Sequence, residues 1–312
     1  MFTINPYTPA LADEWNRFVA ASKNGTFLFD RRYMDYHADR FSDHSLLVLR
    51  RNRLYALLPG NAVGETFYSH QGLTYGGLIL GRQATADGVC DAFMAINERL
   101  RQDGFKRVVY KPTPHIYHQM PSEEDAYALY VRCKARLEAR NASSTILLNN
   151  RLPLTESRRS GLRKALAAGV TMEESRQPEL FWPILTANLQ RRYDAHPVHT
   201  LYEMQLLMSR FPQHIRLFLA LGPDREPLGG TLLYLSPCVV HTQYIASTPE
   251  GRSLGALDLL FDRLLSQSWP QRYFDFGTSA IGADCELNQP LFFQKQGFGA
   301  RTVCYDAYSY DL

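Results

Sequence analysis

The hydrophobic and polar positions of this chain follow the same order of patterns twice: strand, strand, helix, strand. In the second half, apolar runs at 228–235 and 239–248 are separated by Ser236-Pro237, which predicts a β-hairpin. A helix is expected next, because apolar residues recur at helical spacing from Leu254 to Leu265. A short apolar run at 273–277 then predicts a buried strand.

The first half shows the same succession with different residues. Because the two halves share spacing but almost no residue identities, we interpret them as a repeat of topology. A coincidence within one α/β sheet is the alternative. The elements predicted for this half are hairpin strands at 46–49 and 54–58, a helix at 84–103, and strands at 107–111, 133–137 and 144–148 that complete the first sheet.

The chain is long enough for two domains, since domains typically hold about 100 to 200 residues and this chain has 312. The polar, proline-containing stretch 149–153 marks the boundary, so the expected domains are 1–150 and 151–312. The other elements expected in the second domain are strands at 170–174 and 215–221 and helices at 156–167, 178–193 and 201–211.

Composition narrows the class of protein without indicating an activity. Hydrophobic residues make up 45% and charged residues 21%, as in ordinary globular proteins, and a formal charge of +3 is too mild to indicate nucleic-acid binding. The five cysteines include no C-x-x-C pair, which argues against a disulfide framework or a zinc site. The N-terminus lacks a secretory pattern, and no apolar run is long enough to cross a bilayer. We therefore expect a cytoplasmic protein with no bound metal, no DNA partner and no membrane insertion.

The turn between the second hairpin and its helix has the features of an anion site. Gly251, Ser253 and Gly255 leave room for a phosphate to approach backbone N–H groups, and Arg252 would reinforce that site. The matching turn of the first half, 81–87, offers one glycine and an acidic residue. Only the second half is therefore expected to bind a phosphate-bearing donor.

Four segments of the second half carry a family resemblance: 241–248, 250–256, 274–277 and 291–299. They resemble the GNAT superfamily of acyl-CoA N-acyltransferases, and within it the double-domain, Fem-like branch, whose namesakes attach amino acids to peptidoglycan precursors. The resemblance implies an α/β (α+β) fold of two tandem GNAT-like domains, each a mixed, mostly antiparallel sheet flanked by helices. It also implies an acyl-CoA such as acetyl-CoA as co-substrate and no tightly bound cofactor. Leu257 departs from the family's phosphate loop, which has Gly or Ala at that place, and this weakens the case for coenzyme A.

The resemblance also assigns roles to residues of this chain. Strand amides near the acyl carbonyl would stabilise the oxyanion, a carboxylate would accept the ammonium proton, and a tyrosine would return a proton. Asp275 has a structural alternative as a strand-end carboxylate bonded to backbone, and His241 has one as a structural histidine. The assigned residues are Ile245, Ala246, Ser247, Gly251, Arg252, Ser253, Leu254 and Gly255 for the donor, Asp275, Glu286 and Tyr305 for catalysis, and Lys111, Tyr117, His241 and Lys295 for the acceptor.

These assignments predict an N-acyltransferase that moves an acyl or aminoacyl group to an amine held in the cleft between the domains. The acceptor would be a small molecule or an amine resembling a peptidoglycan precursor. Two alternatives stay open: a non-catalytic binding protein that kept the fold, and a Fem-like ligase that uses aminoacyl transfer RNA. The absence of a sustained heptad run, and so of the coiled-coil arm of Fem proteins, disfavours transfer RNA. Serine hydrolases, P-loop kinases and dinucleotide enzymes are disfavoured, because their motifs do not occur.

Overall fold

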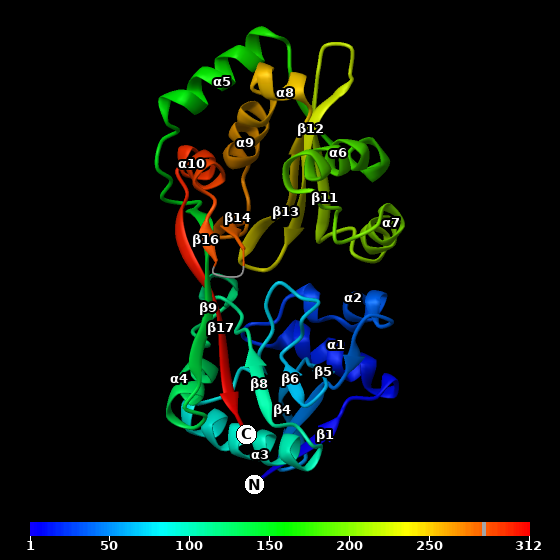
Figure 1. Cartoon of the computed structure of the whole chain (residues 1–312), viewed down its shortest axis with the longest axis vertical. Coiled ribbons are helices and arrows are strands. Elements are labelled where there is room, and N and C mark those ends of the chain that lie inside the picture. Colours follow the sequence, from blue (N-terminus) through cyan, green and yellow to red (C-terminus); the bar gives the residue numbers. More distant parts are fainter. Residues whose placement is uncertain (283–284) are drawn as a thin grey trace. The chain divides into compact units, whose positions relative to one another are not determined.

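Residues 1–282 and 285–312 are described by the computed structural model in Figure 1, and they form two compact units. Unit 1 comprises 1–142 and 304–312 with Gly282, Cys285 and Glu286, and unit 2 comprises 143–281 and 287–303. Strands β9 (Arg136–Leu147), β16 (Glu286–Leu287) and β17 (Arg301–Asp311) each contribute residues to both units. The chain therefore divides at other positions than the single boundary predicted near residue 150.

Unit 1 contains a four-stranded antiparallel sheet in the order β1-β3-β4-β7 and a second group in the order β17-β8-β6-β5-β2. The predicted hairpin is confirmed as β3 and β4, which pair from Leu46↔Leu58 to Arg50↔Arg53. In the second group only β6 and β8 run parallel. The bounds are β1 (Phe2–Pro6), β2 (Ser42–Asp43), β3 (Leu46–Arg50), β4 (Arg53–Leu58), β5 (Asn61–Val63), β6 (Thr66–Tyr68), β7 (Ile79–Leu80), β8 (Arg107–Tyr110), α1 (Ala12–Ala21), α2 (Arg31–Met34), α3 (Ala86–Gln102) and α4 (Glu124–Val131).

The core of unit 1 lies between α3 and its strands. Phe93, Ile96 and Leu100 recur on one stripe of α3 and are buried with Leu46 of β3 and Val108 of β8. This is the apolar face that the period of the sequence indicated for a helix in this region.

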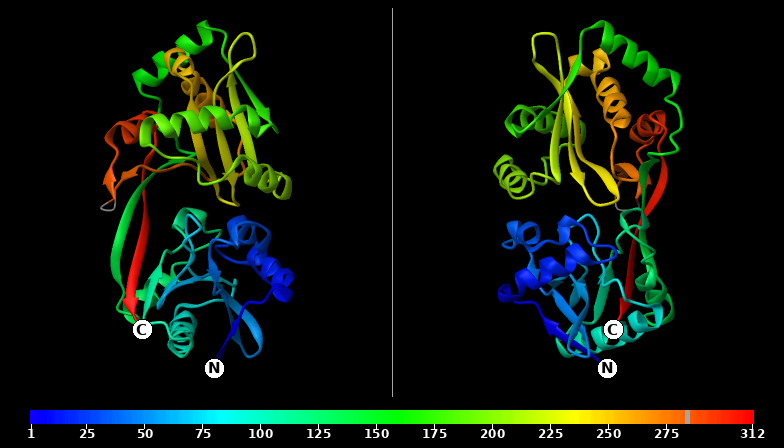
Figure 2. Two further views of the ribbon diagram at one scale, coloured as in Figure 1. Left: turned by 45° about the vertical axis from the view of Figure 1, so that its right-hand side comes forward. Right: turned by 180° about the vertical axis from the view of Figure 1, so that it is seen from behind.

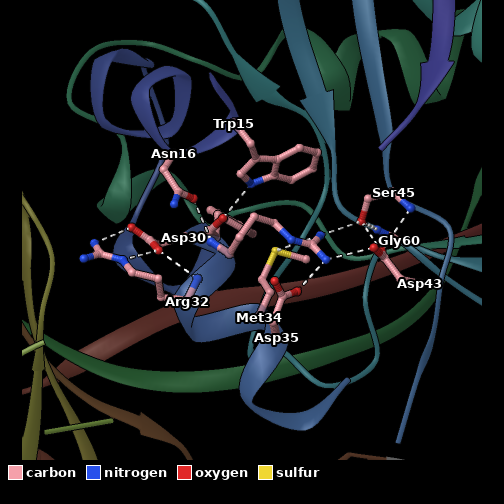
Figure 3. A network of polar contacts seen from close by, with 11 residues as sticks. Trp15, Asn16, Asp30, Arg32, Met34, Asp35, Asp43, Ser45 and Gly60 are labelled. Carbon is pink, nitrogen blue, oxygen red and sulfur yellow. Dashed lines mark hydrogen bonds and ion pairs between the residues drawn. The ribbon is translucent and has the colours of Figure 1, made fainter. Parts of the chain in front are cut away.

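Arg31, a buried arginine, ties α2 to β2 in unit 1, and Figure 3 labels its two carboxylate partners, Asp35 and Asp43. The Arg31 guanidinium donates to Asp35 Oδ1 at 2.6 Å and to Asp43 Oδ2 at 2.8 Å, and it lies 3.8 Å from the centre of the Tyr7 ring. Two carboxylates and an aromatic face compensate the desolvated charge, so this network stabilises the unit without needing a ligand.

Unit 2 is built on one sheet in the order β10-β11-β12-β13-β14-β9, in which only β13 and β14 are parallel. Helices α5, α9 and α10 cover one face, and α6 and α7 cover the other (Figures 1 and 2). Phe261 of α9 packs against Phe274 and Phe276 of β14. The bounds are α5 (Glu156–Ala167), β10 (Thr171–Ser175), α6 (Trp182–Tyr193), α7 (Leu201–Arg210), β11 (Ile215–Leu221), β12 (Pro227–Leu235), β13 (Val239–Ser247), α8 (Pro249–Leu254), α9 (Ala256–Ser266), β14 (Tyr273–Thr278), β15 (Ala280–Ile281), β16 (Glu286–Leu287) and α10 (Gln289–Gly297).

Two predictions about these elements were wrong. The strands expected at 133–137 and 144–148 are one strand, β9, whose C-terminal part pairs with β14 in unit 2 rather than completing the first sheet. The turn expected at 249–252 is the short helix α8, because Thr248 caps it and Pro249 occupies its first turn. No helix within the described ranges is sufficiently long and apolar to span a bilayer.

Candidate active site

Strands β13 and β14 part where their pairing ends, at His241↔Asp275. Strand β13 continues to Ser247, and its register with β12 skips between Leu232 and Leu233, so Gln243 forms a β-bulge. Beyond His241, within the described residues, the edge of β13 that faced β14 pairs with no strand. Backbone N–H groups on that edge can therefore bind a carbonyl oxygen of a ligand. The predicted donor residues Ile245, Ala246 and Ser247 lie in this stretch.

Asp275 is fully buried at this parting point. Its Oδ1 accepts hydrogen bonds from Ser143 Oγ at 2.6 Å and Thr145 Oγ1 at 2.7 Å, and its Oδ2 lies 2.8 Å from His241 Nδ1. Desolvation raises the pKa of the carboxyl, but the bond and charge of His241 and the two hydroxyls outweigh it and hold this pKa below the usual value. A buried, ionised carboxylate thus stands directly behind the imidazole.

His241 presents its second ring nitrogen away from that carboxylate. Its side chain is 12% exposed, and no residue in the described part of the chain bonds Nε2. Because ionised Asp275 accepts a hydrogen bond from Nδ1–H, the neutral imidazole carries its lone pair on Nε2. The pair is therefore arranged as a proton acceptor, and Asp275 can act on a substrate only through His241.

Lys295 of α10 fixes the backbone just after this pair. Its buried Nζ donates to Gly277 O at 2.8 Å and Thr278 O at 2.9 Å. Burial lowers the pKa of Lys295 to about 8, and the charge of Asp275 opposes that shift. Gly277 has a φ of 73°, a backbone conformation that favours glycine. A Cβ at this position would also lie 3.2 Å from His241 Cε1, so glycine leaves room for the imidazole ring.

The segment from Gly251 to Gly255, predicted to bind a phosphate and here called the phosphate corner, is largely filled by contacts within the chain itself. Gly251 N donates to Thr248 Oγ1 at 2.9 Å, and Gly255 N donates to Arg252 O at 3.3 Å. A Cβ on Gly255 would lie 2.3 Å from Gly161 O of α5, so that helix rests directly on the α8–α9 junction. Asp258 in the first turn of α9 pairs with Arg158 of α5 at 2.7 Å. This geometry argues against a diphosphate held on the loop amides.

Comparison with known proteins identifies the fold. No family model matches the sequence, and no curated protein matches it. A crystal structure of FemX superposes with a TM-score of 0.68 at 13% identity and covers 99% of this chain and 97% of its own. The fold is a tandem GNAT fold.

Two further structures agree with this fold. L-PGS from Bacillus licheniformis gives a TM-score of 0.63 at 11% identity, covering 98% of this chain and 92% of its own. A tandem GNAT protein from the clavulanic acid biosynthesis pathway, solved without AcCoA, gives 0.53 at 13% identity, covering 100% of this chain and 98% of its own. The predicted fold class, two GNAT-like domains with mixed, mostly antiparallel sheets, is confirmed.

Three arginines lie on the surface of unit 2, on the helices next to the end of β13: Arg191 and Arg192 on α6, and Arg252 on α8. Asn188 Nδ2 of α6 donates to Ser247 O at 3.1 Å and so anchors α6 there. Desolvation, followed by the charges of Arg192 and Arg191, lowers the pKa of Arg252, so both charges act on the Arg252 side chain. All three side chains are exposed and can reach an anion. Of the other predicted donor residues, Ser253 is exposed and Leu254 packs against the core.

The remaining predicted site residues belong to unit 1. Tyr305 donates to Tyr117 at 2.9 Å, and both side chains are buried. Lys111 Nζ donates to Leu73 O at 2.9 Å, and burial lowers the pKa of this lysine to about 8. Glu286 is exposed on β16. Among the described residues, the structure thus joins Asp275, His241 and Lys295 in one cluster and Tyr117 with Tyr305 in another.

Sequence reasoning missed Ser143 and Thr145, the hydroxyl donors to Asp275. Both lie on β9, which the sequence assigned to the first sheet, so no pairing with β14 was expected. Residues 143–146 of β9 are all buried, so no alternation distinguishes the face of Thr145, and a strand pattern does not identify the neighbouring strand.

Proposed function

We propose that unit 2 catalyses transfer of an acyl group to an amine. The observation that carries this proposal is the His241–Asp275 pair at the point where β13 and β14 separate. His241 Nε2 takes a proton from the attacking amine while the C–N bond forms and the bond from the acyl carbon to the donor breaks. The departing thiolate or alkoxide takes up the proton that His241 has accepted, which returns the imidazole to its starting state. Amides on the open edge of β13 bind the developing oxyanion.

Lys295 and Asp275 support this step without touching the substrate. Asp275 holds the imidazole in one orientation and stabilises the imidazolium that forms, as the carboxylate does in other acid–base pairs. Lys295 holds the carbonyls of Gly277 and Thr278 and so keeps the end of β14 turned away from β13. Tyr305 and Glu286 stay candidates for returning or accepting a proton, and Lys111 and Tyr117 for binding the acceptor amine.

The first donor to test is an acyl-CoA such as acetyl-CoA, because the tandem GNAT fold supports a thioester donor. A second candidate, transfer from aminoacyl transfer RNA, is favoured by one observation: the amides of Gly251 and Gly255 already bond within the chain, while exposed arginines lie on α6 and α8 (Arg191, Arg192 and Arg252). Guanidinium groups on a surface suit a phosphodiester backbone, whose binding weakens steeply with salt. In both cases the proposed acceptor is the amine of a small molecule or of a compound resembling a peptidoglycan precursor.

The test is a turnover screen of purified protein with acyl thioesters and aminoacyl transfer RNA against a panel of amines. Release of free thiol together with an amide product would identify a thioester as the donor. Turnover with aminoacyl transfer RNA but with no thioester, weakened by salt, would identify aminoacyl transfer RNA as the donor. Arg252→Glu should weaken donor binding, whereas Arg176→Glu, at another exposed arginine of unit 2, should leave it unchanged. A protein that binds an acceptor but turns over no donor would support the non-catalytic alternative and contradict the proposal.

A further inference from the structure

The turn that joins α4 to β9 in unit 1 presents aromatic and cationic side chains to solvent. Tyr127 and Tyr130 lie one helical turn apart on α4 and are 56% and 76% exposed. Leu137, just into β9, is 47% exposed. Large apolar side chains gathered at one place on a surface usually mark a contact with a partner.

The cations of this turn all point outward. Val131, Cys133 and Ala135 pack against the core of unit 1. Arg132, Lys134 and Arg136 alternate with these three residues and are exposed. Arg132 N donates to Ala128 O, and Ala135 N to Leu129 O, so the turn is held against α4.

These three charges differ from their neighbours in having no acidic partner. Arg107 pairs with Glu138 at 2.9 Å, and Arg140 pairs with Asp306 at 2.7 Å. Within 1–282 and 285–312, no carboxylate pairs with Arg132, Lys134 or Arg136. The surface formed by Tyr127, Tyr130, Arg132, Lys134, Arg136 and Leu137, here called the α4–β9 surface, therefore carries an uncompensated positive charge.

We propose that the α4–β9 surface binds an anionic membrane surface. Tyrosine rings with one apolar body and one polar end suit the headgroup region of a bilayer, and unpaired cations are attracted to anionic headgroups. Peripheral binding needs two such signals together, and this surface supplies both. Leu137 favours lipid over single-stranded RNA, because an aliphatic side chain inserts among acyl chains but offers no ring for base stacking. Binding is to the surface of the membrane only.

Co-sedimentation of the full chain with vesicles tests this inference. Vesicles of equal parts phosphatidylglycerol and phosphatidylcholine should carry the protein down at low salt, and phosphatidylcholine alone should not. The triple variant Arg132→Gln, Lys134→Gln, Arg136→Gln should weaken binding roughly a hundredfold, since each charge near an anionic leaflet contributes roughly fivefold. Tyr127→Ser with Tyr130→Ser should also weaken it. All these side chains are exposed, so the variants should fold.

A control removes the same charge elsewhere in unit 1. Arg51→Gln, Arg53→Gln and Arg82→Gln replace three exposed arginines outside the α4–β9 surface and should leave vesicle binding unchanged. Equal binding by the two triple variants would show attraction to net charge alone and overturn the proposal. Equal binding to neutral vesicles, or binding of single-stranded poly-uridine with no binding to either vesicle, would overturn it as well.

Discussion

His241 Nδ1 lies 2.8 Å from Asp275 Oδ2, and the two residues are also register partners on the parallel strands β13 and β14. Because the partners face each other across the ladder, the backbone itself sets the distance between imidazole and carboxylate. The strands stop pairing at this same position. A proton acceptor and an open strand edge therefore occur together, and acyl transfer to an amine needs both.

Asp275→Asn should lower turnover by about 10² to 10⁴ and leave donor binding intact, because an amide neither orients nor stabilises a protonated His241. The measurement is single-turnover transfer together with a donor binding isotherm. Ser143→Ala is the matched control: it removes one of the two hydroxyl bonds to Asp275 but keeps the carboxylate and the histidine. If Ser143→Ala lost as much turnover as Asp275→Asn, packing around the carboxylate, and not its charge, would explain the loss.

Gly277→Ala should reduce turnover and cost about 2 kcal/mol of stability. The added methyl meets the His241 ring at 3.2 Å in a backbone conformation that alanine tolerates poorly. Gly282→Ala is a close control, since its φ is 69° against 73° at Gly277 and no atom of the described residues lies within 4 Å of its added Cβ. Both variants carry the backbone strain, but only the first crowds the imidazole. Equal turnover by Gly277→Ala and Gly282→Ala would show that crowding of the His241 ring does not affect catalysis.

The order of the elements could be predicted from the sequence because each carries its own local signal. The 239–248 strand, the helix through Phe261 and the 273–277 strand follow from apolar spacing and from Ser236-Pro237. The GNAT motif likewise placed Asp275, His241 and Lys295 on the second unit. Their contact depends on pairing between strands distant in sequence, which no local pattern specifies.

The phosphate corner shows where a motif is insufficient. Gly251 and Gly255 suggested room for a ligand, but the structure uses that room for close approach of its own chain, to Leu228 O and Gly161 O respectively. Glycine allows both uses equally, so the two glycines alone could not distinguish them. Leu257, which departs from the family motif, was the one residue that pointed to the difference, and it packs against the core.

Lys295 should make stability depend on pH in alkaline solution. Its pKa is about 8 in the folded protein against 10.5 when solvated, so the unfolded chain binds more protons between these values. The free energy of unfolding of the wild type should therefore rise relative to Lys295→Met, by about 2 kcal/mol, as pH goes from 8 to 10. Urea unfolding at several pH values measures this. The free energy of unfolding of Lys106→Met, a substitution at an exposed lysine, should change with pH as it does in the wild type. The same pH dependence in Lys295→Met and the wild type would contradict the prediction.

The contact of α5 with α9 should depend on the Arg158–Asp258 pair. Burial raises the pKa of Asp258, and the charge of Arg158 and its hydrogen bond oppose that shift. Arg158→Met should cost about 2 kcal/mol, because it leaves a buried carboxylate without its partner, while Met keeps most of the packing on Phe298. The double variant with Asp258→Asn should recover much of this loss in urea unfolding. Additive losses would mean that the pair is not coupled.

The most direct test of the whole account is transfer of a labelled acyl group to an amine under single-turnover conditions, with wild type and His241→Gln compared at equal donor occupancy. The account predicts labelled amide from the wild type. His241→Gln should form it more slowly by at least about 10², because glutamine cannot accept the proton of the attacking amine. Amide formed at the same rate by His241→Gln, or no amide from any thioester or aminoacyl transfer RNA with the folded wild type, would contradict it.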